Sequence, residues 1–118
     1  MIALDTSALM AFLLEEPDAA AVYDALLSAD GLVISAGTVL EALIVSDRRG
    51  LGAQMRALFE ELGVEIAPVN AAVAAEIARA YRRWGKGIHP AGLNFGDCFA
   101  YVLAAGRNVP LLCTGADF

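Results

Sequence analysis

The sequence predicts a single α/β domain, a parallel sheet of about four strands covered on both faces by helices. Its 118 residues suit one compact domain, and 58% of them are apolar, which excludes intrinsic disorder. Short apolar runs of strand length alternate with longer segments of helical length. This alternation is typical of parallel sheets, because each parallel strand needs a long crossover. Since there is no internal repeat or linker, we expect the domain to span residues 1–118.

The candidate strands are the apolar runs at residues 1–5, 31–35, 64–69 and 109–113. Apolar runs without regular polar alternation are typical of strands that are buried on both faces of a parallel sheet. In such folds ligands bind beyond the carboxyl ends of the strands. We therefore expect the functional residues at that edge.

Six segments between the strands have helical length and matching end signals. Pro17 suits the first turn of the second segment, Gly50 and Gly63 close the third and fourth, and Asn70 caps the fifth. A glycine-rich loop over residues 85–94 precedes the last segment. The expected helices are residues 7–14, 18–29, 38–49, 52–62, 70–84 and 95–105.

Charge and cysteine content restrict the class of protein. The net charge of −6 argues against a general nucleic-acid coat protein, but not against an enzyme whose acids surround a metal. No run approaches the roughly 20 apolar residues of a membrane span, and no basic segment precedes the apolar start. Cys98 and Cys113 lie in apolar sequence, as expected for reduced core residues of a cytoplasmic protein.

Four carboxylates stand in apolar surroundings at the ends of predicted elements. Asp5 ends the first strand, and Asp117 follows the last. Glu41 and Asp97 lie on helices whose apolar residues cover nearly every direction, so we expect both helices to be buried. An unpaired buried carboxylate costs several kcal/mol, and half of the basic residues lie within residues 79–86. A shared Mg²⁺ or Mn²⁺ ion would resolve this, because both ions prefer carboxylate oxygens.

Helix capping and turn formation could also account for the positions of some of these carboxylates, without a metal. The run from Thr38 to Glu41 fits a capping box, and the run from Asn94 to Asp97 fits a looser version. Asp5 fits a simple strand-to-helix turn equally well. The spacing of the acids is not a compact motif, so the residues alone support an acidic metal site without identifying a reaction.

Four segments that span the chain in order resemble a known family: MIALDTSALMAFLLEEPD, ISAGTVLEALIV, GKGIHPAGLNFGDCFAYVLA and PLLCTGADF. The most specific parts are the opening apolar-Asp-Thr-Ser pattern and the block HPAGLNFGDCFAY. Together they resemble PIN domains of the VapC toxin type. The resemblance implies a PIN-like three-layer sandwich and a metal-dependent endoribonuclease that forms homodimers and is held inactive by an antitoxin protein.

The acidic pocket of that family carries over onto Asp5, Glu41, Asp97 and Asp117, as catalytic ligands of Mg²⁺ or Mn²⁺. The resemblance also implies three polar neighbours that orient ligands or waters: Thr6, Ser7 and Asn94. Members of the family usually continue beyond the final Asp-Phe pair, so we expect the C-terminal tail of the family to be missing here.

Basic residues that could contact RNA gather around the end of the fifth helix: Arg79, Arg82, Arg83, Lys86 and His89. An arginine stripe opposite an apolar face could grip phosphates beside the pocket. The same stripe is also explained as the solvated side of an amphipathic helix. A single loop histidine is more often incidental than functional.

Other classes of protein fit parts of the same pattern. A receiver-type phosphoacceptor domain binds Mg²⁺ through acids at strand ends, but it normally has a lysine near its last strand, and the only lysine here is Lys86. A haloacid-dehalogenase-like phosphatase would have a second aspartate at the position of Ser7. A catalytically silent PIN-like interaction module stays possible, because a sequence does not report turnover.

Overall fold

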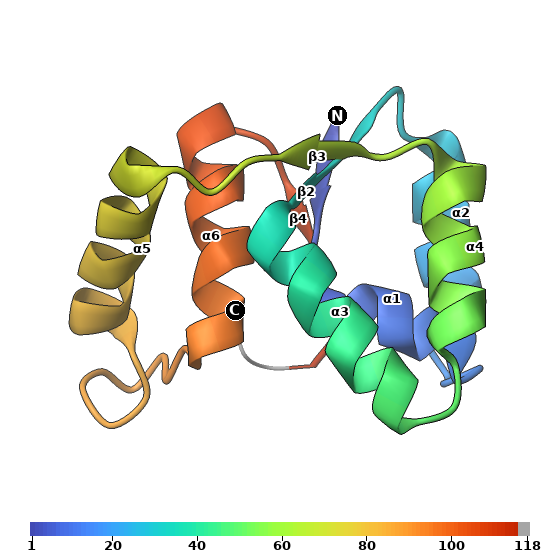
Figure 1. The fold of residues 1–118 in the computed structure, drawn as a ribbon, viewed down its shortest axis with the longest axis horizontal. Helices are drawn as coiled ribbons and strands as arrows, with labels where there is room; N and C mark the ends of the chain where they lie inside the picture. Colours follow the sequence, from blue (N-terminus) through green and yellow to red (C-terminus); the bar gives the residue numbers. More distant parts are fainter. Residues whose placement is uncertain (116–118) are drawn as a thin grey trace.

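The protein is described here by a computed structural model, which covers residues 1–115. The strands in this part of the chain are β1 (Ile2–Leu4), β2 (Leu32–Ser35), β3 (Glu65–Ala67) and β4 (Leu111–Leu112). The helices are α1 (Thr6–Leu13), α2 (Ala19–Ser28), α3 (Ala36–Arg48), α4 (Gly52–Leu62), α5 (Ala71–Trp84) and α6 (Phe95–Arg107). Strands and helices alternate in the predicted order, although the strands are shorter than expected (Figure 1).

The four strands form one parallel sheet with the order β3-β2-β1-β4. Ala3 of β1 pairs with Val33 on one side and with Leu111 on the other. The chain therefore moves from β1 through β2 to β3 in one direction, and β4 returns to the free side of β1. The strand order reverses between β1 and β4, which is where open parallel sheets form ligand sites.

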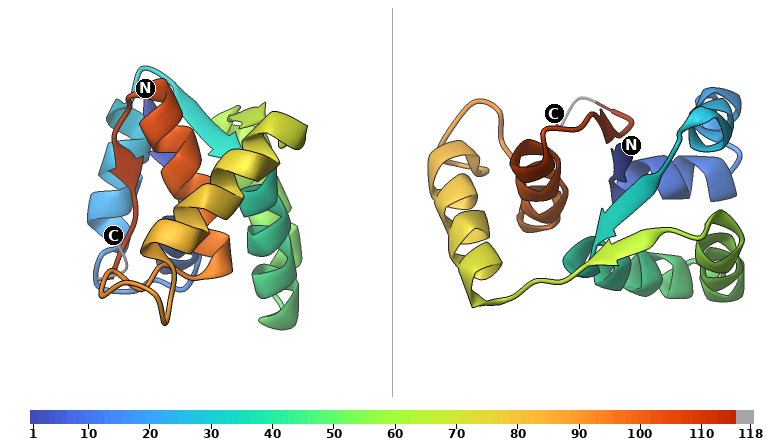
Figure 2. Two further views of the ribbon diagram at one scale, coloured as in Figure 1. Left: turned by 90° about the vertical axis from the view of Figure 1, so that its left-hand side faces the viewer. Right: turned by 90° about the horizontal axis from the view of Figure 1, so that it is seen from above.

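Helices cover both faces of the sheet because successive strand residues point to opposite sides. Ala3 and Val33 belong to a cluster that includes apolar residues of α6, whereas Leu4 and Ile34 lie in the larger core with α1, α2, α3 and α4. Figure 2 shows α5 and α6 together on one side of the sheet and α1, α2 and α4 on the other. The predicted α/β architecture with a central parallel sheet is thus confirmed.

Helix α3 differs from the prediction at its start and on its outer face. It begins at Ala36, and its N-cap is Ser35, whose side chain accepts a hydrogen bond from the Gly37 backbone N–H at 3.2 Å. The capping box predicted from Thr38 is therefore wrong. Leu40 of α3 is 61% exposed. The expectation that this helix is buried all round is also wrong, because only one of its faces packs on the core.

Helix α6 shows the same departure, since Phe95 at its start is 70% exposed. The predicted helix ends at Asn70 and Gly63 are confirmed. Asn70 accepts a hydrogen bond from the Val73 backbone N–H, and Gly63 ends α4 in the left-handed conformation. Pro17 lies before α2 and not in its first turn, which corrects that prediction.

Cys98 and Cys113 form no disulfide in the described part of the chain, and only Cys98 lies in the core as predicted. Cys98 is buried, and Cys113 is partly exposed. In the part of the chain that the structure describes, no helix combines the length and apolar character needed to cross a bilayer.

The pairing of Ile34 with Ile66 provides a test of where the core lies. The two residues face each other on adjacent strands, but Ile34 is fully buried and Ile66 is largely exposed on the edge strand β3. We expect Ile34→Ala to lower the free energy of unfolding by about 2–5 kcal/mol. The control Ile66→Ala should lower it by less than about 1 kcal/mol. Urea unfolding followed by circular dichroism measures both, and equal losses would contradict this placement of the core.

Candidate functional site

Asp5 directly follows β1 and caps α1. Its Oδ2 accepts hydrogen bonds from the Ser7 backbone N–H at 3.1 Å and from Ser7 Oγ at 2.6 Å. The residue is only 3% exposed, and its Oδ1 is buried without a hydrogen-bond partner. Leaving a buried carboxylate oxygen unpaired is costly, so Asp5 is suited to receive a further donor or a cation at Oδ1.

Glu41 connects three helices at the same edge of the sheet. Its Oε1 accepts a hydrogen bond from Thr6 Oγ1 at 2.6 Å. Its carboxylate also lies against Gly96 at the start of α6, so closely that a Cβ on Gly96 would stand 1.9 Å from Glu41 Oε2. Glu41 is therefore held by its neighbours in space, and the capping role considered for it from the sequence is wrong.

Asp97 lies in the first turn of α6 and is 7% exposed. Asn94 and Asp97 form a reciprocal capping box: Asp97 Oδ2 accepts the Asn94 backbone N–H at 3.0 Å, and Asn94 Oδ1 accepts the Asp97 backbone N–H at 2.8 Å. The capping role predicted for Asp97 is confirmed. It does not exclude a ligand role, because a carboxylate has two oxygens and several lone pairs.

The Cys98 thiol, next to Asp97 in sequence, is not prepared for nucleophilic chemistry. Burial raises its pKa above the usual range, and the Asp97 carboxylate raises it further. A raised pKa keeps the thiol protonated at neutral pH, whereas the thiolate is the reactive form. Cys98 is thus a packing residue.

The chain beyond β4 returns to this corner of the molecule. The Asp5 backbone N–H donates to the Leu112 carbonyl at 3.1 Å, and the Thr114 backbone N–H donates to Ser7 Oγ at 3.0 Å. No local signal in the sequence points to Thr114, because it and Ser7 are 107 positions apart. Asp117, the fourth predicted acid, lies outside the described residues.

The structure thus brings Asp5, Glu41 and the first turn of α6 to one corner, through Thr6 and Gly96. Within residues 1–115 it contains no group of three or more acidic, histidine or cysteine side chains already arranged to hold a metal. The donor atoms nevertheless suit a hard divalent cation, because they are carboxylate oxygens and Asp5 Oδ1 is buried and unpaired. Of the basic side chains in this part of the chain, Arg56 pairs with Asp47 and Arg107 with Glu65, away from these acids.

The predicted RNA-contacting residues do not lie within this acidic corner. They stand on the exposed side of the last turns of α5 and on the loop that follows: Arg79, Arg82, Arg83, Lys86 and His89. His89 Nδ1 accepts the Ala91 backbone N–H at 2.9 Å, and its ring packs edge-on against Trp84. These contacts give His89 a structural role in the loop.

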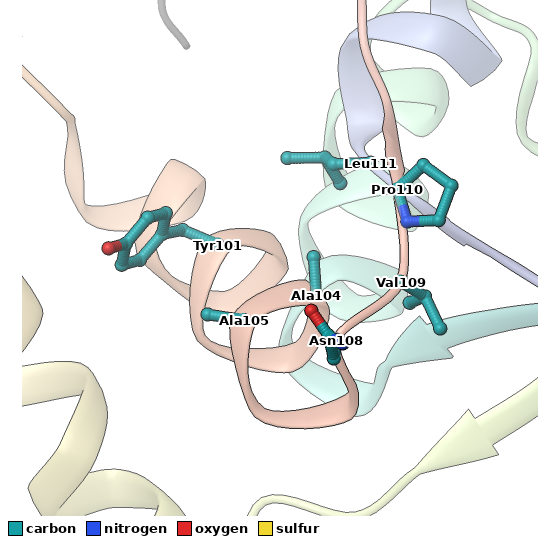
Figure 3. Close-up of a pocket in the computed structure, with 7 residues that line it drawn as sticks. All are labelled: Tyr101, Ala104, Ala105, Asn108, Val109, Pro110 and Leu111. Carbon is teal, nitrogen blue, oxygen red and sulfur yellow. The ribbon is translucent and has the colours of Figure 1, made fainter.

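Two hollows have different relations to the acids. A hollow of about 480 Å³ lies between the end of α6 and the start of β4, lined by Tyr101, Asn108 and apolar neighbours (Figure 3). It contains no carboxylate and opens at the opposite end of β4 from Asp5. A groove of about 280 Å³ between α3 and α6 reaches Glu41 and is otherwise mainly apolar, with Leu40 and Phe95 at its surface.

Comparison with known proteins places the chain in a family. The profile of the PIN domain matches residues 2–118. Ribonuclease VapC28 of Mycobacterium tuberculosis is 46% identical over 98% of this chain and 90% of the relative, and ribonuclease VapC36 of the same species is 44% identical over 98% and 86%. Ribonuclease VapC of Mycolicibacterium smegmatis is 40% identical over 98% and 92%.

Solved structures support the same fold. VapC20 of M. tuberculosis, described as a toxin that cleaves the sarcin–ricin loop, has a TM-score of 0.79 at 14% identity, covering 99% of this chain and 92% of its own. A toxin–antitoxin complex from Klebsiella pneumoniae has a TM-score of 0.70 at 14% identity, covering 94% and 83%. By its sequence profile and its VapC relatives, with a parallel sheet whose carboxyl edge gathers acids from distant segments, the chain belongs to the PIN-domain family.

Proposed function

We propose that this protein is a metal-dependent endoribonuclease that acts as the toxin of a toxin–antitoxin pair. Its relatives over nearly the whole chain are VapC ribonucleases, at 40–46% identity. The proposal rests on one observation. Asp5, Glu41 and the helix turn that contains Asp97 come together at the sheet edge where the strand order reverses between β1 and β4. Carboxylates collected there from three segments are what metal-assisted phosphodiester hydrolysis requires.

In this proposal Asp5, Glu41 and Asp97 hold Mg²⁺ or Mn²⁺, with Asp117 as the fourth carboxylate that the family resemblance implies. When bound, the ion would lower the pKa of a water molecule and stabilise negative charge on the phosphate and the leaving oxygen. Three polar neighbours position the acids. Ser7 binds Asp5 Oδ2, while Asp5 Oδ1 stays buried and without a hydrogen-bond partner. Thr6 binds Glu41, and the Asn94 backbone binds Asp97. No side-chain nucleophile is needed.

Replacing Asp5 by asparagine tests the charge separately from the cap. Asparagine caps helices about as well as aspartate, so Asp5→Asn should keep the fold. It removes the charge at the buried Oδ1, and we expect RNA cleavage in Mg²⁺ or Mn²⁺ to fall by at least about 100-fold, the loss typical of a group that stabilises transition-state charge. Cleavage of labelled RNA, with and without EDTA, measures the effect.

The matched control is Asp18→Asn, an exposed aspartate at the N-cap of α2 that makes no side-chain cap hydrogen bond. This control should cleave RNA like the parent protein. Cleavage that persists in EDTA, or that survives Asp5→Asn, would contradict the proposed mechanism. Binding of RNA without any cleavage would favour the catalytically silent module.

Gly96 tests the position of Glu41. Because a Cβ at Gly96 would collide with the Glu41 carboxylate, Gly96→Ala should displace that carboxylate and reduce cleavage by about 10–100-fold, as expected for a change beside a metal ligand. Gly106→Ala, on the same helix with no atom within 4 Å of the added Cβ, should leave cleavage unchanged. Equal activity of the two variants would show that the placement of Glu41 is unimportant for the reaction.

We also propose that the protein forms a homodimer and binds an antitoxin, as the resemblance to VapC toxins implies. The exposed apolar residues Leu40, Ile44 and Phe95 all line the groove between α3 and α6. We assign this surface to a second copy of the chain, because exposed apolar patches commonly mark protein interfaces.

Light scattering after size-exclusion chromatography tests the dimer. The parent protein should have twice the mass of the 12.3 kDa chain. Leu40→Lys should shift it to the monomer mass, because a charge would be buried at the interface. Leu27→Lys, at a similarly exposed position on α2, should stay dimeric. A monomeric parent, or an unaffected Leu40→Lys, would exclude this interface.

A further inference from the structure

Basic side chains without ion-pair partners gather at the end of α5. Within residues 1–115, Arg56 and Arg107 are engaged by Asp47 and Glu65, and the N-terminus by Asp30. In the same part of the chain no ion pair involves the four basic residues that we call the α5 basic surface: Arg79, Arg82, Arg83 and Lys86. These four are exposed, and within residues 1–115 they form a larger group of unpaired basic residues than Arg48 and Arg49 at the end of α3.

Three members of the α5 basic surface stand on α5, and Lys86 lies just beyond its end. Arg79, Arg82 and Arg83 stand three and four residues apart, so they project from neighbouring positions, while Ile77 and Ala80 are buried. The three arginines line a shallow depression of about 420 Å³ together with Trp84. The Arg83 guanidinium lies 4.7 Å from the centre of the Trp84 ring, which holds it in place as a cation–π contact.

Backbone hydrogen bonds place this surface next to the acidic corner. The Lys86 backbone N–H donates to the Leu93 carbonyl at 2.8 Å, and the Leu93 backbone N–H donates to the Trp84 carbonyl at 3.0 Å. Leu93 is buried and immediately precedes Asn94, the cap of the helix that carries Asp97. Figure 1 shows the intervening loop running from the end of α5 to the start of α6. The end of α5 is therefore tied by its backbone to the start of α6, the helix that carries Asp97.

A purely structural role does not account for the whole cluster. Arginines in the last turn of α5 interact favourably with the helix dipole, which explains Arg82 and Arg83 in part. Arg79 lies earlier in the helix, and like charges spaced three and four residues apart repel one another. An anion bound across the three guanidinium groups would remove that repulsion, and guanidinium groups suit phosphate oxygens because of their planar fork of donors.

We propose that the α5 basic surface binds the backbone phosphates of an RNA strand whose scissile bond lies at the acidic corner. This inference rests on the proposed function, since it assigns RNA as the ligand of the adjoining site. The acids then bind the metal and the arginines supply most of the affinity for RNA. Phosphate contacts position a strand without reading its bases, so binding through this surface should not depend on sequence.

Two matched arginine pairs provide the test. Arg82→Gln/Arg83→Gln removes two charges at the end of α5, and Arg48→Gln/Arg49→Gln removes two exposed charges at the end of α3. Both are made in an Asp5→Asn background with EDTA present, so the RNA stays intact. Fluorescence anisotropy with two labelled single-stranded RNAs of unrelated sequence measures Kd over a series of salt concentrations.

We expect the α5 pair to raise Kd by about tenfold or more at low salt for both RNAs. The slope of log K against log salt concentration should fall in magnitude by about 1.4, since each phosphate contact of a single strand contributes about 0.7. Arg82→Lys/Arg83→Lys should keep the parent slope. The α3 pair should change Kd by less than about twofold.

An unchanged Kd in the α5 pair, an equal loss in the α3 pair, or no RNA binding by the parent would overturn the inference. A protein that shows this dependence of binding on α5 but cleaves no RNA would support the inference while refuting the proposed ribonuclease activity. If the parent protein cleaves RNA but Arg82→Gln/Arg83→Gln leaves Kd unchanged, the result would support the ribonuclease activity and refute the inference.

Discussion

The contact of the Glu41 carboxylate with Thr6 and Gly96 is the interaction on which the rest of the site depends. It joins the first turn of α1, the second turn of α3 and the first turn of α6, at the edge where the strands end. Only a residue without a Cβ at position 96 allows the carboxylate to approach the α6 backbone so closely. The carboxylate thereby reaches the neighbourhood of Asp97, although 56 residues separate the two in sequence.

Asp5, Glu41 and Asp97 already accept hydrogen bonds from the protein, so a cation would bind the carboxylate oxygens that these bonds leave available. Asp5 and Asp97 each bind a group at their own helix start, and Glu41 binds Thr6 across space. These hydrogen bonds orient one oxygen of each carboxylate, and they explain how the corner is held without a preformed cluster of three ligands among the described residues. The second oxygen of Asp5, Oδ1, is buried and has no hydrogen-bond partner. A divalent ion would therefore stabilise Asp5 most directly.

The acidic and the basic side chains of the candidate site lie in different places, which suits metal binding in one place and RNA binding in the other. Asp5, Glu41 and Asp97 come from distant segments to the corner where the strand order reverses. The α5 basic surface is joined to the start of α6 through the hydrogen bonds of Leu93. An acidic pocket by itself repels a polyanion such as RNA, so metal binding and a nearby basic surface complement each other. The negative net charge of the chain is thus compatible with a nucleic-acid substrate.

The sequence by itself determined the features that depend on near neighbours: the alternation of strands and helices, the caps at Asn70 and Asn94, and which acids stand at element ends. Composition and hydrophobic pattern act within a few residues, so they can be read along the chain. Tertiary structure decided that Ser35 and not Thr38 caps α3, because the helix start depends on where β2 ends. It also decided which apolar face of α3 stays exposed, and it paired Ser7 with Thr114. These outcomes depend on packing between segments far apart in sequence, which no local pattern encodes.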